Sequence, residues 1–488
     1  MDAERSGRMG PEPEYRLISS QGGETATSGV GNKIITHDGK THVAWLDATE
    51  AGYFAQVRTL DRATGEWSGP FTLGTATDDH GRPAMTMDSR GYLHVVFGVH
   101  HDQVPYRRSL RPNDASEWTP TVTFGGDMTY PALVCGADDT LYMAGRSRWE
   151  GSRLYAKPPG GDWEDRGLII RTLEGCFSYA AYHPGLAWGP DHRTLHLSTS
   201  TYQSKTKQSN LWGTIQSANY MRSTDGGATW ERADGTPIPV PATSETMDVL
   251  AAGESSFAKP GIRNQGAIVV DSTGRPFVLY IHYNMPRPGQ VFLVTPDGQG
   301  RWQHLPLQAA LDEHWPDMAV IDCRAGFSIT EDDTLCIALT LIPRDHPVAE
   351  RERMAWRTPD RPDAHHSTKL EETYYLGLPC YSTNPENARI SYESANTWCA
   401  ENPARRRIAW LESRDGGRTY TARDVIGPDP QMPPNQPSLE RPTGFNRVVS
   451  GTLPGMIYSV LTAGSRSKRS VMDHRVYWAD AGSPRGGA

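Results

Sequence analysis

The sequence predicts an all-β protein, a seven-bladed β-propeller, and three observations carry that prediction. A unit of apolar strand, Asp/Gly turn and second apolar strand recurs along the chain, with turns near Asp38, Asp88, Asp138, Asp191, Asp271 and Asp332 and a weaker copy at residues 453–455. The first three intervals are 50, 50 and 53 residues, which is the spacing expected for four-stranded blades. A pair of Asp-boxes and a turn-rich composition are the other two observations.

The Asp-boxes are residues 223–230, STDGGATW, and residues 413–420, SRDGGRTY. In each box the Gly pair permits positive φ and the Asp side chain can cap its own turn. The closing aromatic residue can pack between sheets. This octet is typical of a propeller hairpin and is a structural signal, so it says nothing about a ligand.

The composition agrees with a large, turn-rich β protein. The 488 residues are 37% hydrophobic and include 48 Gly and 37 Pro. A net charge of −8 argues against nucleic acid or an anionic membrane as a general partner. No apolar run is long enough to span a membrane, and the first residues hold no apolar secretory core. We therefore expect a cytoplasmic protein, or a secreted one whose leader is missing from this chain.

The domain organisation expected is one propeller domain over residues 1–488, with insertions at about 203–260 and 344–400. The ring can close if a strand near residues 15–18 pairs with the final strand near residues 476–478, since that leaves no free sheet edge. Six sparse cysteines are expected to be reduced, and Cys135 and Cys336 lie inside strand patterns that favour a core position.

Two consecutive hairpins carry the most informative side chains. The first is DDHGRPAMTMDSRGYLHVVFGVHH over residues 78–101, which brackets its turn with His80 and His100. The second is TYPALVCGADDTLYMAGRS over residues 129–147, which does the same with Tyr130 and Arg146. Because a hairpin brings its open ends together, we expect these four residues, called the rim below, to meet at one edge of adjacent blades.

Equivalent strand ends supply further candidates for substrate binding. They are His101, Tyr182, Tyr202, Arg263, Asn264 and Tyr283. Each rim residue alone also has a structural interpretation. His80 can cap a neighbouring backbone, Tyr130 can pack before its proline, and Arg146 can pair with a surface acid.

The rim contains His, Tyr and Arg but no obvious carboxylate pair of the kind that most glycosidases use. This inventory suits β-elimination from a uronic acid. Arg or protonated His neutralises the sugar carboxylate, a His or Tyr base takes the C5 proton, and a second His or Tyr protonates the departing oxygen. That chemistry requires no cofactor.

The segments DHGRPAM, VFGVHH, TYPAL and AYHPGLAW resemble the BNR-type propeller family of ulvan lyases and L-rhamnose-α-1,4-D-glucuronate lyases, with related α-L-rhamnosidases. The resemblance covers the first five expected blades and implies a lyase acting on rhamnose–glucuronate linkages. It implies that Tyr130 is the acid/base, Arg146 neutralises the carboxylate, His80 transfers a proton or holds the uronate, and His100 assists. Tyr182 takes the place of a further active-site tyrosine. The implied partner is an anionic oligo- or polysaccharide that contains uronic acid.

Several alternatives stay open. An α-L-rhamnosidase on the same scaffold would hydrolyse the same linkage, and a non-catalytic carbohydrate-binding propeller would explain the aromatic residues. A sialidase is disfavoured because the arginines of the two Gly-Arg-Pro segments do not supply its arginine triad. The resemblance also allows a structural calcium or zinc ion, whose ligands the sequence does not identify. Candidate ligands are His365, His366, Cys380 and Cys399.

Overall fold

The structure is a computed structural model that describes most of the chain outside its two ends. The described residues are 15–23, 25–29, 31–148, 150–176, 182–203, 215–254, 262–264, 266–282, 290–320, 325–343, 371–375, 378–382, 406–427, 434–449, 454–461 and 474–480. Within them, every pairing between named strands is antiparallel, and one short helix, α1 (Leu307–His314), is present. The all-β prediction is confirmed.

Two large sheets hold the N-terminal third of the chain together with its last strands. The first contains β32 (Pro434–Leu439), β33 (Gly455–Leu461), β34 (His474–Asp480), β1 (Tyr15–Gly22), β3 (Lys40–Thr49), β4 (Gly52–Asp61) and β5 (Phe71–Ala76), with β2 (Ile34–His37) on β3. The second contains β13 (Glu164–Arg171), β12 (Gly151–Lys157), β11 (Leu141–Ser147), β10 (Val122–Cys135), β8 (His100–Arg111), β7 (Leu93–Val96) and β6 (Ala84–Met87), with β9 (Asp114–Trp118) on β8.

The remaining described strands form four smaller sheets. The third sheet contains β14 (Gly185–Trp188), β15 (Leu195–Gln203), β16 (Ile215–Ser223), β17 (Trp230–Glu231), β18 (Pro237–Ile238) and β19 (Asp248–Glu254). The fourth contains β20 (Ile262–Arg263), β21 (Ile268–Val270), β22 (Pro276–His282), β23 (Gln290–Pro296) and β24 (Trp302–Leu305). The fifth contains β25 (Met318–Val320), β26 (Gly326–Ile329), β27 (Leu335–Pro343), β30 (Arg407–Ser413) and β31 (Thr421–Ile426). The sixth is the pair β28 (Glu371–Tyr375) and β29 (Leu378–Ser382).

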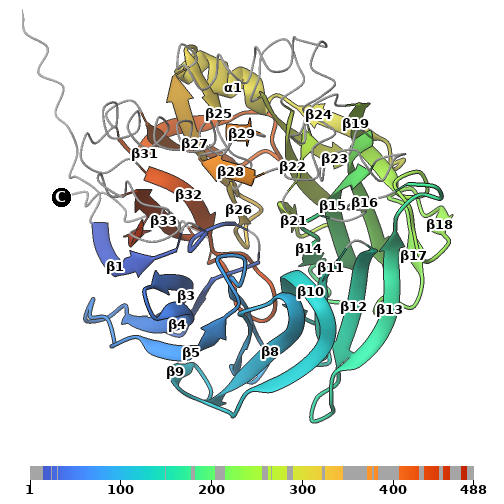
Figure 1. Cartoon of the computed structure of the whole chain (residues 1–488). Helices are drawn as coiled ribbons and strands as arrows, with labels where there is room; N and C mark the ends of the chain where they lie inside the picture. The colour runs from blue at the N-terminus through green and yellow to red at the C-terminus, as the bar shows by residue number, and fades with distance from the viewer. Residues whose placement is uncertain are drawn as a thin grey trace, which may run out of the picture.

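The main sheets follow one another around a common centre in chain order, so the fold is propeller-like (Figure 1). The ring closes as the sequence predicts, because β1 pairs with β34 in the register Tyr15↔Ala479, Arg16↔Trp478 and Leu17↔Tyr477. The first described strand thereby joins the last three strands to β3, β4 and β5 in one sheet, and the prediction of ring closure is confirmed.

Both Asp-boxes form the turns that their sequences predict. In the first, the Asp225 carboxylate accepts hydrogen bonds from the Thr229 backbone N–H at 2.8 Å and from the Thr229 hydroxyl at 2.6 Å. Gly226 and Gly227 have φ of 70° and 89°, which L side chains rarely adopt. Asp415 and Thr419 repeat the same two bonds in the second box. The box fixes the hairpin turn and places an aromatic residue behind it.

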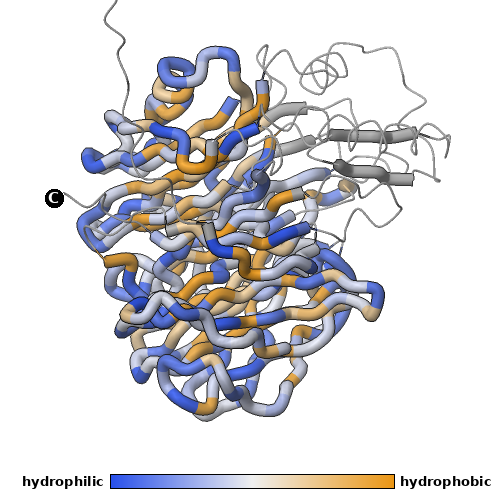
Figure 2. Tube along the Cα trace, turned by 90° about the vertical axis from the view of Figure 1, so that its left-hand side faces the viewer, coloured by the Kyte–Doolittle hydropathy of each residue, from blue (hydrophilic) through white to orange (hydrophobic). Residues whose placement is uncertain are grey.

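The hydrophobic core lies between neighbouring sheets. Ile35 and Ala44 of the first sheet pack in one cluster with Met85 and Val95 of the second, and similar clusters join the later sheets. Each fully buried aliphatic or aromatic side chain contributes about 1.5–3 kcal/mol of transfer free energy. Figure 2 shows hydrophobic and hydrophilic stretches interspersed along the trace.

Two further expectations concern cysteines and membranes. Cys135 and Cys336 are buried free thiols, which confirms their predicted core positions. Among the described residues, no helix has the length and apolar character needed to cross a bilayer.

Candidate active site

The first hairpin brings its two histidines into ring contact. Strands β6 and β7 pair in the register Ala84↔Val96, so His80, before β6, and His100, at the start of β8, lie at the same open end. Their rings stack with centroids 4.0 Å apart and an interplanar angle of 18°. The predicted proximity of His80 and His100 is confirmed.

The second hairpin brings Tyr130 and Arg146 together in the same way. Thr129 pairs with Arg146 across β10 and β11, and the Arg146 guanidinium carbon lies 4.7 Å from the centroid of the Tyr130 ring. The Tyr130 ring is also 5.7 Å from that of His80. The structure therefore brings the predicted rim residues into one cluster, although it assigns them no role.

Tyr130 reaches this place through an irregular backbone. The register of β10 against β11 shifts between Thr129 and Ala132, and Tyr130 has a φ of +55°. A non-glycine residue in this region costs of order 1–3 kcal/mol and is held there by its surroundings. The ring is buried, with 4% of its surface exposed.

Two aspartates that the sequence interpretation missed hold the histidines. The Nδ1 atoms of His80 and His100 lie 2.9 Å and 2.6 Å from the two carboxylate oxygens of Asp78. Asp79 adds a second carboxylate 2.9 Å from His80 Nδ1. Because Nδ1 of each ring faces Asp78, Nε2 is the nitrogen that each histidine can present to a substrate. Asp78 and Asp79 immediately precede His80, but they were indistinguishable from ordinary turn acids in the sequence.

A second arginine, also missed, lies on Tyr130. The Arg82 guanidinium carbon is 4.8 Å from the centroid of the Tyr130 ring, and its Nη1 donates to Ser28 Oγ at 2.7 Å. Arg82 is buried. Tyr130 is therefore packed against two guanidinium groups and beside a histidine, an arrangement that attracts negative charge to the phenol oxygen.

The charged groups around Tyr130 and His80 shift the pKa values of both side chains. Burial raises the pKa of Tyr130, but the positive charges of His80, Arg146 and Arg82 outweigh it and leave the pKa below its ordinary value. Burial lowers the pKa of His80, but Tyr130 and the hydrogen bonds to Asp78 and Asp79 outweigh it and place the pKa well above its ordinary value. The cluster thus favours a proton on the imidazole and a phenol that ionises readily.

Tyr182, Tyr202 and His101 lie around this cluster. The Tyr182 ring is 5.5 Å from Tyr130 and 5.2 Å from Tyr202. Tyr202 is buried and donates its hydroxyl to the Ile262 carbonyl at 2.9 Å. His101 lies beside His100, at a centroid distance of 4.4 Å, with its Nδ1 3.1 Å from Asp127. Tyr182 and His101 thus lie next to the rim, whereas Tyr202 lies behind Tyr182.

Arg263 and Asn264 are both buried, and Asn264 is engaged by the fold. Its Nδ2 donates to the Leu279 carbonyl at 2.8 Å, and its Oδ1 accepts from the Gly266 N–H at 3.0 Å and from Ser198 at 3.2 Å. These bonds join β15 to the neighbouring sheet. Tyr283 lies outside the described residues. Substrate binding by these residues stays a prediction.

His183 is a further residue at the site. Its ring lies 4.0 Å from that of Tyr130, edge to face, and it is buried. Its place directly after Tyr182, a predicted site residue, and before a proline is the sequence signal that could identify it.

A metal site at the rim can be tested on Asp78, His80 and His100, whose candidate ligand atoms all lie within 4.8 Å of one another. The two rings are stacked, and both Nδ1 atoms already face the oxygens of one carboxylate. A metal ion needs ligands that converge from different directions on one point, so this arrangement does not fit one. Of the earlier candidates, His365, His366 and Cys399 lie outside the described residues, and the side chain of Cys380 does too.

Part of the chain is similar in sequence to a protein family and to two ulvan lyases. A sequence profile described as a BNR repeat-containing family member matches residues 40–310. The ulvan lyase of Pseudoalteromonas sp. (strain PLSV) is 27% identical over 219 residues, covering 36% of this chain and 44% of the relative. The ulvan lyase of Alteromonas sp. (strain LOR) is 34% identical over 204 residues, covering 33% of this chain and 41% of the relative. The matched part spans less than half the length of each.

Similar solved structures support the fold. A structure described as a polysaccharide lyase of the PL25 ulvan lyase type superposes with a TM-score of 0.62 at 14% identity, covering 96% of both chains. A second structure of that lyase, bound to -[GlcA(1-4)Rha3S]-, gives the same values. At this identity the likeness establishes a shared architecture.

Proposed function

The chain belongs to the BNR repeat-containing family, and on that premise we propose that it is a polysaccharide lyase that cleaves rhamnose–glucuronate linkages of the ulvan type by β-elimination. The relatives with matching segments are ulvan lyases, and a solved structure of the same fold carries -[GlcA(1-4)Rha3S]-. The proposed substrate is therefore an anionic oligo- or polysaccharide that contains uronic acid.

One observation carries the proposal: a buried tyrosine lies between two arginines and a histidine whose pKa is raised. A hydrolase would need a pair of carboxylates placed to activate water and protonate the leaving group. At this site Asp78 and Asp79 are both turned to His80. The arrangement instead suits removal of a weakly acidic carbon-bound proton, which needs a strong base and a cation beside the substrate carboxylate.

In the proposed reaction, Arg146 binds the uronate carboxylate and stabilises the negative charge that develops on it. The Tyr130 oxygen, as phenolate, takes the C5 proton. The electron pair of that C–H bond forms the C4–C5 double bond, and the bond from C4 to the glycosidic oxygen breaks. His80, protonated and held through Nδ1 by Asp78 and Asp79, donates from Nε2 to the departing oxygen. Transfer of the proton from Tyr130 back to His80 restores the starting state, and no cofactor is needed.

We propose seven blades and a single domain for the architecture. The strands group into seven antiparallel sets along the chain: β2–β5, β6–β9, β10–β13, β14–β18, β21–β24, the set β26, β27, β30 and β31, and the set β32–β34 with β1. Such grouping supports a ring in which each blade buries its faces on its neighbours. The β16–β19 segment lies in the first expected insertion.

The proposal is tested by incubating the protein with rhamnose–glucuronate oligosaccharides, ulvan and gum arabic in parallel. We expect the ultraviolet absorbance of a conjugated, unsaturated uronate to rise with at least one of them. Release of free rhamnose without that absorbance would overturn the lyase assignment in favour of a rhamnosidase. Absence of any product would overturn catalysis on these glycans.

A further inference from the structure

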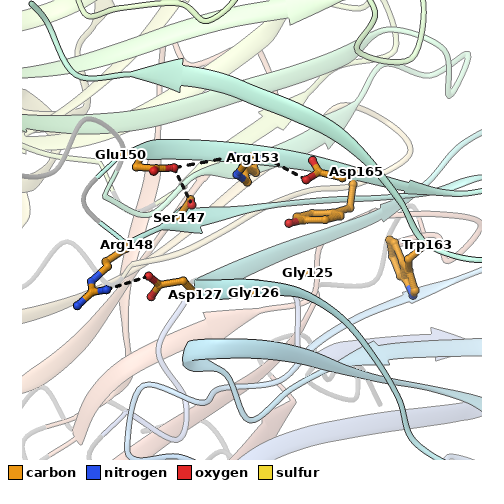
Figure 3. Close-up of a pocket in the computed structure, with 10 residues that line it drawn as sticks. Gly125, Gly126, Asp127, Ser147, Arg148, Glu150, Arg153, Trp163 and Asp165 are labelled. Atoms are coloured by element: carbon orange, nitrogen blue, oxygen red, sulfur yellow. Dashed lines mark hydrogen bonds and ion pairs between the residues drawn. The ribbon is translucent and has the colours of Figure 1, made fainter.

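A groove beside the rim is used by no step of the proposed reaction. It has a volume of about 740 Å³, which lies in the range of sites that hold small-molecule ligands. Figure 3 shows Arg148 and Asp127 at one end, Trp163 at the other, and Glu150, Arg153 and Asp165 along the length between them. The groove is therefore elongated, with a different chemistry at each end.

The groove begins where the rim ends. Asp127 lines it, and one carboxylate oxygen of Asp127 lies 3.1 Å from Nδ1 of His101, the neighbour of His100. Ser147 also lines the groove and directly follows Arg146 on β11. A glycan chain held at the rim could thus continue into the groove without leaving the protein surface.

The charges of the groove are matched within it. Arg148 pairs with Asp127 at 3.4 Å. Arg153 lies between two acids, 2.9 Å from Asp165 and 4.0 Å from Glu150. The lining contains three carboxylates, those of Asp127, Glu150 and Asp165, and two guanidinium groups, those of Arg148 and Arg153. Its balance is one negative charge, so a sulfate or a second uronate placed here would be repelled.

The far end offers part of the ring of Trp163, which is half-buried, whereas Tyr155 is only 4% exposed and supports the wall from behind. Trp163 stacks on Phe124 at 4.1 Å with an angle of 10°, and Tyr155 meets Phe124 edge to face at 5.3 Å. Both Trp163 and Tyr155 line the groove. Gly125 and Gly126, also in the lining, leave one wall without side chains. Aromatic rings suit the C–H face of a sugar, and carboxylates accept hydrogen bonds from its hydroxyl groups.

We propose that this groove, defined by Asp127, Arg148, Glu150, Arg153, Trp163 and Asp165, is a distal subsite that binds an uncharged, unsulfated sugar residue of the same glycan. The proposal rests on the proposed function for the identity of the glycan. The subsite would make the protein select for a sugar residue without an anionic group at a position away from the bond that breaks. The rim attracts negative charge and the groove repels it. The two sites together would therefore favour glycans in which an uncharged residue lies at a set distance from the uronate.

The experiment compares a glucuronate–rhamnose tetrasaccharide with two longer substrates, one extended by unsulfated rhamnose, which carries no charge, and one extended by sulfated rhamnose. The readout is the ratio of kcat/KM for each extended substrate to that for the tetrasaccharide. In the wild-type protein we expect the unsulfated extension to raise kcat/KM about fivefold, the value of one or two good hydrogen bonds, and the sulfated extension to raise it less. Glu150→Gln should lower the first ratio, and Glu150→Lys should raise the second.

Glu117→Gln is the matched control, because Glu117 is an exposed acid paired with Arg111 at 3.1 Å and lies outside the groove. Equal ratios for the two extensions in the wild-type protein, or the same ratios in Glu150→Gln and Glu117→Gln, would overturn the subsite. Failure of the proposed function looks different, since no substrate would then give unsaturated product. In that case calorimetric titration measures the affinity of the protein for each of the two extended glycans. Tighter binding of the unsulfated glycan, lost in Glu150→Gln, would still support the groove as a binding site.

Discussion

The rim and the groove adjoin each other at β10 and β11 yet treat charge in opposite ways. Arg146 and Arg148 are two residues apart. Arg146 is 2% exposed and lies against the rings of Tyr130 and Tyr182, whereas 60% of the Arg148 side chain is exposed and it pairs with Asp127. In the rim, cations surround a group that can become an anion. In the groove, each cation already has its anion.

The difference teaches that burial, more than residue type, decides what an arginine can do. A charge interaction in a buried site is worth several times more than the same interaction in water, while an exposed ion pair contributes about 0–1 kcal/mol. Changes in the rim should therefore alter the chemical step, and changes in the groove should alter binding of longer chains.

The largest effect is expected from Tyr130→Phe. It keeps the ring that packs against Arg82 and Arg146 but removes the oxygen that takes the proton. We expect kcat to fall by about a thousandfold, the usual contribution of a positioned acid or base. Absorbance of the unsaturated product measures it, with circular dichroism as the folding control. A variant that kept wild-type kcat would contradict the proposed role of Tyr130.

Arg146→Lys should lower kcat by about a hundredfold, because an ammonium group cannot make the bidentate contact to a carboxylate that a guanidinium makes. Arg166→Lys is the comparison: Arg166 is 48% exposed, pairs with Glu164 at 2.9 Å and lies outside the rim and the groove. We expect that control to stay within about twofold of the wild-type rate. Similar losses of kcat in both variants would contradict the proposed difference between buried and exposed arginines.

Arg82→Gln should move the pH dependence of kcat/KM. The pKa of Tyr130 is lowered, so the base is lost as pH falls through that pKa; the pKa of His80 is raised, so the acid is lost as pH rises through that one. Removal of the Arg82 charge raises the pKa of Tyr130, and the acid limb of the profile should shift upward by about one pH unit. Arg90→Gln, at an exposed turn, is the control. An unmoved acid limb would show that Arg82 does not act on Tyr130.

The smallest effect concerns the glycines that open the groove. Gly125 has a φ of +66°, and a Cβ there would lie 2.9 Å from the Tyr155 hydroxyl oxygen. Gly125→Ala should lower the free energy of unfolding by about 1–2 kcal/mol. At Gly126 an added Cβ meets no atom within 4 Å, so Gly126→Ala should change stability little. Urea unfolding measures both, and equal losses would mean that the backbone at Gly125 is not constrained as described.

The sequence predicted the parts of the fold and site that follow from hairpin geometry. The ends of a hairpin must meet, so the neighbourhood of His80 with His100 and of Tyr130 with Arg146 could be inferred from turn positions alone. Ring closure followed from the need to cover a sheet edge. These inferences needed the period of the strands but no side-chain detail.

Side-chain direction could not be read in the same way. Asp78 and Arg82 belong to the segment that was singled out, but whether each turns toward the rim depends on a loop conformation that no period encodes. Asn264 sits at a strand end like the rim residues, yet its amide bonds to the Leu279 carbonyl inside the fold. Tyr202 likewise donates to the Ile262 carbonyl. One residue of register separates a side chain that faces a site from one that ties sheets together.

The pairing of β1 with β34 has a consequence for how the chain acquires its fold. The contact joins residues from opposite ends of the sequence, such as Tyr15 and Ala479, so its loop-closure entropy is among the largest that this chain can incur. Contacts of such long range slow folding. During synthesis the first sheet can be completed only after β32, β33 and β34 have left the ribosome, while the second and third sheets can already have formed. Pairing of β1 with β34 would then be a late step in folding, the one that closes the ring. A peptide with the sequence of β1 would compete with β1 for pairing with β34.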